Sequence, residues 1–225
     1  MSTGDQRGER TRADDAADVA FLAHLSGQMR LAADADALLL QGAQAIGRYL
    51  DFNRCAFTEV HEIDGSSIIY PDYRDPQGLR SASGTYALST YPSGLIDALK
   101  KGRVLSVGDT SIDPLTAPFQ TPIYGPLGVR AFVSVPLIRN GRLAGTLSAG
   151  RQQPHSWGVR EIALLQALAE HVWNALEARR LDLHLRESEL RFRRLASLAP
   201  VGIFETDAEG NCLFVNEKWC DLTGL

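Results

Sequence analysis

The sequence predicts an α+β fold in which an antiparallel sheet is flanked by helices and followed by one long helix. Three observations carry this prediction. Apolar residues recur at helical spacing in the first part of the chain. Two dipeptides typical of tight hairpin turns, Asp64-Gly65 and Asn140-Gly141, each separate two runs of strand-like residues. Neither Pro nor Gly interrupts residues 159–199, a run far longer than an ordinary globular helix.

The first elements follow from local patterns. Residues 1–18 are charged, contain Gly and lack an apolar run, so they predict a flexible leader and no signal peptide. Amphipathic helices are expected over residues 19–31 and 34–50. Residues 54–61 alternate between the two faces of a predicted strand. After the turn, this strand pairs with a second strand over residues 67–73.

The middle of the chain predicts shorter elements and a long loop. A strand is expected over residues 85–89, a helix over 93–101 and a strand over 104–107. Four prolines make residues 109–128 a surface loop, and its aromatic residues mark it as a lid candidate. A central hairpin of residues 130–138 and 143–149 then closes the sheet.

The long helix is expected to begin at Ser156 as its N-cap and to carry two apolar stripes. Because one exposed helix of this length buries little surface, the pattern favours a homodimeric coiled coil through residues 156–195. The alternative is that the first stripe packs on the domain's own sheet. The first stripe consists of Ile162, Leu165, Ala169, Val172, Leu176, Arg179, Leu183, Arg186 and Leu190. The second stripe consists of Leu181, Leu185, Ser188, Phe192 and Leu195.

Composition excludes several classes of protein. The 225 residues are 44% hydrophobic and 22% charged, which is typical of a soluble globular chain and excludes global disorder. A net charge of −4 gives no reason to expect a nucleic acid partner. No run is long and apolar enough for a membrane helix, so this fragment is expected to be cytoplasmic without a membrane span. Three widely spaced cysteines fit a reducing compartment and predict no metal site.

Two stretches carry a resemblance to a known family. The run LGVRAFVSVPLIRNGRLAGTLSAG, residues 127–150, resembles the strand pair of a GAF domain. The run HSWGVREIALLQALAEHVWNALEARR, residues 155–180, resembles the closing GAF helix of bacterial sensor proteins. The resemblance implies a GAF-type antiparallel sheet flanked by helices, a GAF sensory domain over residues 19–180, and a long signalling helix.

The C-terminal residues resemble a second family. Residues 187–225 are similar to the beginning of a PAS domain, with an Asp-x-x-Gly turn at Asp207 to Gly210 between two short strands. This implies a linker or coiled-coil helix over residues 181–195 and a truncated PAS α/β start over residues 196–225. A GAF domain followed by a PAS domain is similar to the input half of bacterial sensor histidine kinases in two-component systems, and less often of diguanylate cyclases.

Catalytic motifs are not evident in the sequence, which contains no G-x-x-x-x-G-K-[ST], H-E-x-x-H or G-x-S-x-G pattern. His171 lies on the long helix without either common kinase-box context, so we interpret it as an ordinary helix histidine. The fragment itself is therefore expected to be non-catalytic. A full-length parent would be an ATP-dependent protein histidine kinase.

Cysteine chemistry is the alternative that the GAF resemblance keeps open. Bilin-binding relatives attach their chromophore through a Cys, and residues 109–129 contain neither Cys nor His, so no covalent bilin is expected. Relatives that reduce methionine sulfoxide use several cysteines, whereas Cys55 is the only one in this domain. Cys55 is interpreted as a small buried strand residue. A GAF domain with its own redox or chromophore chemistry remains the competing hypothesis.

The resemblance also implies a small-molecule ligand of unknown identity between the sheet and the lid. Arg130 could clamp an anionic group with Asp109 as its ion-pair partner, or the two could form a structural pair. Plain core packing is the alternative for each aromatic candidate. The candidate ligand-binding residues are Phe57, Tyr70, Tyr73, Asp109, Phe119, Tyr124, Arg130 and Phe132.

Overall fold

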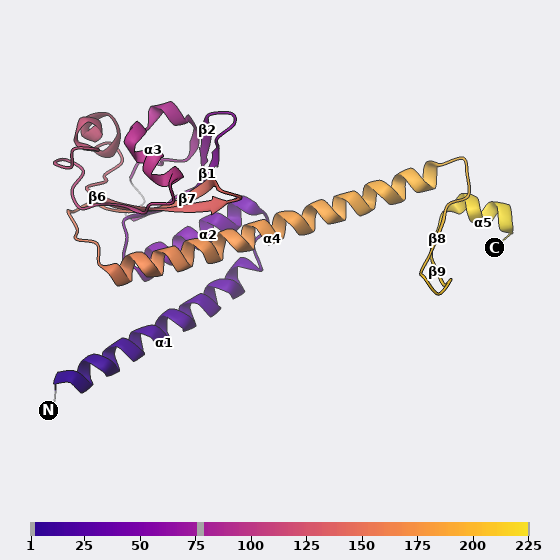
Figure 1. Cartoon of the computed structure of the whole chain (residues 1–225), viewed down its shortest axis with the longest axis horizontal. Helices are drawn as coiled ribbons and strands as arrows, with labels where there is room; N and C mark the ends of the chain where they lie inside the picture. Colours follow the sequence, from indigo (N-terminus) through magenta and orange to yellow (C-terminus); the bar gives the residue numbers. More distant parts are fainter. Residues whose placement is uncertain (1–2, 76–78, 225) are drawn as a thin grey trace. The chain divides into compact units, whose positions relative to one another are not determined.

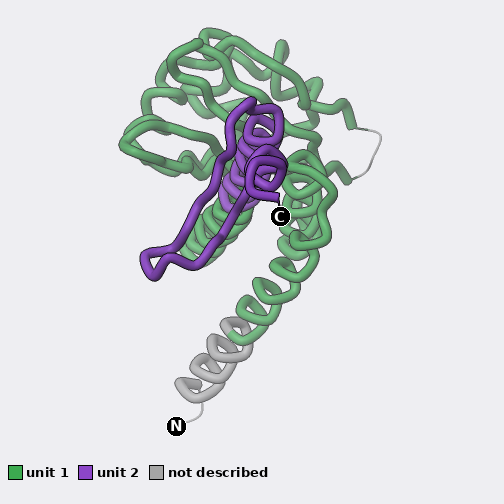
Figure 2. The backbone as a smooth tube through the Cα atoms, turned by 90° about the vertical axis from the view of Figure 1, so that its right-hand side faces the viewer, with its two compact units in different colours: residues 1–176 green, residues 177–225 purple. Residues whose placement is uncertain are grey.

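The computed structural model describes the backbone of residues 3–75 and 79–224, and side chains from residue 16 onward within those ranges. The chain divides into two compact units, residues 1–176 and residues 177–225, coloured green and purple in Figure 2. None of the described helices has the length and apolar character that a bilayer crossing requires.

Unit 1 is built on one antiparallel sheet with the strand order β4-β2-β1-β7-β6-β5, and β3 pairs with β1 beside this path. Its strands are β1 (Arg54–His61), β2 (Ser66–Ile69), β3 (Tyr73–Arg74), β4 (Gly84–Ala87), β5 (Leu105–Val107), β6 (Ala131–Arg139) and β7 (Arg142–Arg151). The order places β1 and β7 at the centre, where each is paired on both sides. The predicted α+β class with an antiparallel sheet is confirmed.

Both expected hairpins are present. At the β6–β7 turn, Asn140 has a φ of 51° and Gly141 a φ of 74°, as a two-residue type I′ turn requires. The expected strand over residues 67–73 is split, however, because β2 ends at Ile69 and β3 begins at Tyr73. Pro71 lies between them, and proline has no N–H to donate to a continuing ladder.

The helices of unit 1 cover opposite faces of the sheet. Figure 1 shows α2 (Ala35–Tyr49) and the first part of α4 (Val159–Leu198) on one face, and α3 (Ser93–Lys100) on the other. Asp34 caps α2 by accepting a hydrogen bond of 2.8 Å from the Ala37 N–H.

Two helix boundaries differ from the prediction. Helix α1 (Thr3–Met29) begins well before residue 19, so its helical backbone extends back through the stretch expected to be a leader. Only its C-terminal part carries core residues among the described side chains, including Leu25 and Met29. Helix α4 begins at Val159, so Ser156 is not its N-cap. The residue directly before the helix is Gly158, whose carbonyl accepts from the Ile162 N–H.

Each face of the sheet has its own core. The larger core lies between the sheet and helices α1, α2 and α4, and it includes Phe57, Val172 and Trp173. The smaller core lies under α3 and includes Leu95 and Phe132. Successive residues of a strand point to opposite faces of the sheet, so the central strands contribute side chains to both cores.

Unit 2 contains residues 177–198 of α4, the strands β8 (Phe204–Thr206) and β9 (Cys212–Val215), and α5 (Glu217–Thr223). Asp207 and Gly210 form the expected turn between the strands, and the φ of Gly210 is 87°. The amide of Asn216, 3% exposed, donates to the carbonyls of Ala196 (2.8 Å) and Val201 (2.9 Å). Its side-chain oxygen accepts from the N–H groups of Ile203 (2.8 Å) and Trp219 (2.9 Å).

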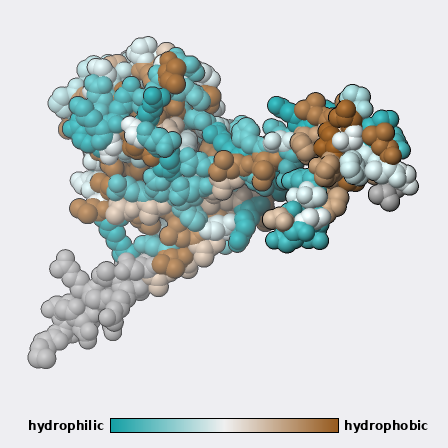
Figure 3. Space-filling model, turned by 45° about the vertical axis from the view of Figure 1, so that its right-hand side comes forward, coloured by the Kyte–Doolittle hydropathy of each residue, from teal (hydrophilic) through white to brown (hydrophobic). Residues whose placement is uncertain are grey.

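The surface of unit 2 is rich in apolar side chains, some of which are visible as brown atoms in Figure 3. The exposed large hydrophobic residues of this unit are Leu181, Leu183, Leu185, Leu190, Phe192, Leu195, Leu198, Val201, Phe204, Leu213 and Leu222.

Candidate functional site

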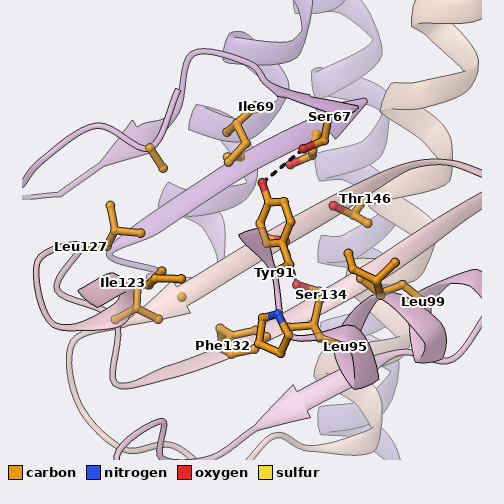
Figure 4. A pocket seen from close by; sticks show the side chains of 18 of the residues that line it. Ser67, Ile69, Tyr91, Leu95, Leu99, Ile123, Leu127, Phe132, Ser134 and Thr146 are labelled. Atoms are coloured by element: carbon orange, nitrogen blue, oxygen red, sulfur yellow. Dashed lines mark hydrogen bonds between the residues drawn. The ribbon is translucent and has the colours of Figure 1, made fainter. Parts of the chain in front are cut away.

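A cavity of about 180 Å³ lies in unit 1 on the α3 side of the sheet (Figure 4). The sheet forms its floor, and α3 together with the expected lid over residues 109–128 contributes to its other walls. In that lid only the short helices η2 (Ala117–Phe119) and η3 (Gln120–Tyr124) are present, as its prolines require.

Small residues on the central strands form the floor. Ala56 and Thr58 on β1 line it, as do Thr146 and Ser148 on β7 and Ser134 on β6. The hydroxyls of Ser134 and Ser148 lie 2.7 Å apart and hydrogen-bond to each other. This pairing satisfies two polar groups that would otherwise face an apolar space.

Larger apolar side chains line the other walls. Leu95 and Leu99 come from α3, and Ile123, Tyr124 and Leu127 come from the lid. The Tyr124 ring stacks on Phe132 with a centroid distance of 5.5 Å. Burial raises the pKa of Tyr124 to about 12.

Tyr91 projects into the space between the walls, and its hydroxyl lies 3.2 Å from Ser67 Oγ, as the dashed line in Figure 4 shows. Burial raises the pKa of this tyrosine as well. Tyr91 therefore provides a neutral ring and a hydrogen-bonded hydroxyl at the cavity.

Arg54 is the charged residue among the described cavity-lining residues. Its side chain is 9% exposed and forms an ion pair with Asp72, whose side chain is 1% exposed. The guanidinium also donates to the carbonyls of Arg80 (2.5 Å) and Leu127 (3.0 Å). Burial lowers the pKa of Arg54, while the neighbouring charge of Asp72 acts in the opposite direction.

Asp72 is held in place by further donors. Ser81 donates its hydroxyl at 2.6 Å, and the Ala82 N–H donates at 3.3 Å. The Nε atom of Arg74 lies 3.4 Å from Asp72 Oδ1, the oxygen that also accepts from Ser81. Arg54 and Asp72 therefore join β1, the segment after β3 and the end of the lid in one buried network.

Two of the expected aromatic residues, Tyr124 and Phe132, line the cavity. Phe57, Tyr70 and Tyr73 do not line it, which corrects the expectation that they lie between the sheet and the lid. Phe57 and Tyr70 are buried in the core on the helix side of the sheet, and Tyr73 packs against that core. Phe57 alternates with the cavity-lining Ala56 and Thr58 along β1, so it points away from the cavity. The Tyr70 hydroxyl donates to Glu59 at 2.5 Å, and the Tyr73 ring packs on Gly47 of α2.

Asp109 and Arg130 form the expected ion pair, at 2.8 Å between the Arg130 Nη2 and Asp109 Oδ2 atoms and 3.2 Å between Nε and Oδ1. The Arg130 guanidinium and the Ser111 hydroxyl hold the pKa of Asp109 well below its usual range. Neither residue lines the cavity, and Phe119 does not line it either, which corrects their expected place. The Nη2 atom of Arg130 also donates to the Ser111 hydroxyl at 3.3 Å.

Cys55 is completely buried on β1, and burial raises its pKa. A thiol in this environment is a poor nucleophile. The described residues contain no group of three or more His, Cys, Asp or Glu side chains placed to hold a metal ion.

Comparison with known families agrees with this geometry. The GAF domain family matches residues 34–176, and a PAS domain family matches residues 190–225. The chain therefore belongs to the GAF domain family, and a PAS segment follows its GAF domain. Both are sensory domains, so the chain is a sensory input region of signal transduction. No curated protein matches the chain.

Solved structures share the fold at low identity. A phycoerythrobilin-bound GAF domain from a cyanobacterial phytochrome has a TM-score of 0.62 and 16% identity, covering 74% of this chain and 98% of that one. A free methionine-R-sulfoxide reductase from Neisseria meningitidis, solved with its substrate, has a TM-score of 0.57 and 20% identity, covering 72% and 89%.

The chromophore-binding domain of a bacteriophytochrome from R. palustris has a TM-score of 0.57 and 18% identity over 72% of this chain. The chain spans only 62% of that structure's length. At these identities the likeness to all three structures establishes the fold alone.

Proposed function

We propose that the chain is the ligand-sensing input region of a cytoplasmic sensor histidine kinase. A small molecule binds in the GAF cavity, and helix α4 passes the signal through a parallel homodimer to later domains. The cavity between the sheet and α3 is the observation that carries this proposal, because apolar pockets with a few polar groups are typical of small-molecule sites. We place the GAF domain at residues 19–180, the connecting helix at 181–195 and the PAS segment from 196 onward.

The lining of the cavity argues against covalent bilin attachment. Phycoerythrobilin is bound in one structural neighbour, but no Cys or His is among the described cavity-lining residues of this chain. A methionine sulfoxide reductase activity is also disfavoured, because Cys55 lies on the opposite face of the sheet in the core. Reversible binding is the mode that the cavity supports.

Native mass spectrometry with an absorption spectrum tests ligand sensing directly. Gently purified chain is expected to carry a retained small molecule and to be colourless in the visible range. The Ala56→Leu variant, which fills the floor of the cavity, is expected to lose that mass, whereas Ala87→Leu on the exposed surface of β4 keeps it. A wild-type chain without any retained mass, or the same mass in both variants, would contradict the proposal.

The exposure of the apolar residues of helix α4 differs between its two parts. In unit 1, Leu165, Val172 and Leu176 of the first stripe are completely buried in the domain's own core. In unit 2, Leu185 of the second stripe is 61% exposed and Leu195 is 64% exposed. A 4-3 spacing of exposed apolar residues is the pattern that a second helix covers in a coiled coil.

Two matched substitutions test which stripe forms the dimer. Leu185→Glu is expected to weaken dimerisation at least about tenfold. In the proposed dimer Leu185 is buried against the partner helix, and the substitution places a charge there. Leu183→Glu makes the same change two positions away, on the first stripe, and is expected to leave the dimer intact. Sedimentation equilibrium of the full chain measures both. A monomeric wild type would contradict the dimer, and a larger effect from Leu183→Glu would assign it to the other stripe.

A further inference from the structure

We infer that the hydroxyls of Thr58 and Thr146 are the polar recognition point of the GAF cavity. They select a ligand with an apolar body about one ring in size and a planar end group of two polar atoms, an amide or a carboxylate. This inference rests on the proposed sensing function and specifies the chemical class of its ligand. It follows from the register of β1 and β7, the lack of partners for both hydroxyls and the volume of the cavity.

The two threonines are neighbours on the floor of the cavity. Thr58 of β1 lies directly opposite Thr146 of β7 in the antiparallel register. Residues paired in this way point to the same face of the sheet, with Cβ atoms about 4.5–5.5 Å apart. Both residues line the cavity. One small polar group of a ligand can therefore reach both hydroxyls.

Neither of these hydroxyls has a hydrogen-bond partner in the part of the chain that the structure describes. Thr146 is only 6% exposed, and Figure 4 shows its hydroxyl on the side of the residue that faces Tyr91 across the cavity. The neighbouring hydroxyls of Ser134 and Ser148, in contrast, bond to each other at 2.7 Å. Because a buried polar group without a partner is costly, the threonine pair indicates a ligand that supplies the partners.

An amide or a carboxylate matches this pair. A hydroxyl can both donate and accept a hydrogen bond, so a carboxylate accepts from both threonines, whereas an amide accepts from one and donates to the other. The charge beside the cavity accommodates either group, because Arg54 and Arg74 share the single carboxylate of Asp72. One end group with two polar atoms therefore satisfies both hydroxyls.

The other walls favour an apolar body. Leu95 and Leu99 of α3 and Leu127 of the lid are aliphatic, and Phe132 provides a ring against which the ligand can pack (Figure 4). Tyr124 contributes one further hydroxyl on the lid side. An apolar cavity of about 150 Å³ holds a benzene molecule, so about 180 Å³ holds one ring with a small end group.

Three probes of similar shape test the end group. Benzamide and benzoate carry the two polar groups, and cumene has an isopropyl group in their place. Isothermal titration calorimetry of the full chain at pH 7.5 measures the polar probes, and displacement of the tighter one measures cumene. Each probe is compared between wild type and Thr146→Val, which removes the hydroxyl and keeps the shape of the side chain. Because each probe is compared with itself, its own hydration cancels.

We expect Thr146→Val to weaken the binding of benzamide or of benzoate about tenfold, because one polar atom of the end group loses its partner. Cumene binding is expected to change less than about twofold. Thr58→Val is expected to have the same selective effect. Thr85→Val, at an exposed position on β4 of the same sheet, is the matched control and is expected to leave all three probes unchanged. The polar probe that shows the loss identifies the end group.

The unliganded protein gives an independent readout. Thr146→Val is expected to leave the urea midpoint of unfolding unchanged or to raise it, because the substitution removes a buried hydroxyl that has no partner. A hydroxyl that served only to stabilise the fold would give the opposite result. A lower midpoint for Thr146→Val than for wild type would therefore overturn the inference.

The remaining outcomes separate the ligand class from the sensing function. Equal weakening of cumene and the polar probes by Thr146→Val, or no weakening of either polar probe, overturns the proposed class and leaves ligand sensing intact. Binding of a polar probe to Ala56→Leu as tightly as to wild type places the probe outside the cavity and also overturns the class. Failure of all three probes while native mass spectrometry shows a retained mass has the same meaning. Failure of all three probes without a retained mass overturns both proposals.

Discussion

Asp72→Asn is expected to lower the free energy of unfolding of the GAF domain by about 3–5 kcal/mol, the usual cost of breaking a buried ion pair. The substitution leaves the Arg54 guanidinium, 9% exposed, without its counter-charge. Ser81 and Ala82 donate to different carboxylate oxygens of Asp72. The substitution replaces one of these two oxygens with an amide nitrogen, which cannot accept a hydrogen bond. The network that joins the sheet to the lid would lose its central acceptor.

Urea unfolding of the full chain, followed by tryptophan fluorescence, measures this loss. Asp75→Asn is the matched control, because it makes the same change three residues away at an exposed position and is expected to alter stability little. Adding Arg54→Met to Asp72→Asn removes the uncompensated charge and is expected to restore part of the stability. A loss below about 1 kcal/mol for Asp72→Asn would show that the pair is not buried as described.

Trp173→Ala is expected to cost about 3–5 kcal/mol, as large aromatic truncations in cores do. Trp173 is 2% exposed and lies in the core between α4 and the sheet. Its ring packs on Gly145 of β7 so closely that a Cβ there would come within 2.6 Å of the ring. The substitution therefore leaves a cavity where α4 contacts the central strands.

Trp173→Phe is the graded comparison, because it keeps a ring over Gly145 and is expected to cost clearly less than Trp173→Ala. Thermal unfolding followed by far-ultraviolet circular dichroism measures both. Equal losses for the two variants would mean that ring packing on Gly145 does not stabilise the contact between α4 and the sheet.

Much of the fold follows from local sequence signals. Asn140-Gly141 fixes the central hairpin because both residues take a positive φ, and few other dipeptides do so easily. The start of α1 does not follow from such signals. Residues 3–18 carry no apolar pattern, yet the backbone there is helical and continuous with the packed part of α1. The polar residues of that segment contain no proline that would end a helix.

The cavity was only partly predictable. Among the aromatic candidates that the GAF resemblance implies, Tyr124 and Phe132 line the cavity, whereas Phe57 lies on the other face of the sheet. Both faces of β1 are covered, so alternation alone does not tell which face adjoins the cavity. Small residues mark the cavity face of β1. Ala56 and Thr58 leave space on that face, whereas Phe57 fills the core on the other face.

The Arg54–Asp72 pair was not predictable from spacing. The two residues lie 18 positions apart, and the pair brings Arg54 close to Leu127 of the lid, 73 positions away. Such long-range contacts depend on the folded sheet rather than on any local pattern. The sequence shows only an arginine at the start of a strand, and there a buried arginine is indistinguishable from an exposed one.

The alternation of β1 also determines how this domain can evolve. Even-numbered positions such as Ala56 and Thr58 face the cavity, while Cys55 and Phe57 face the helix-side core. Substitutions at the even positions can change the shape of the cavity while the helix-side core stays intact. A one-residue insertion or deletion in β1 would exchange the two faces and place Phe57 in the cavity. The shape of the cavity can therefore diversify by substitution, whereas the length of this central strand must stay constant.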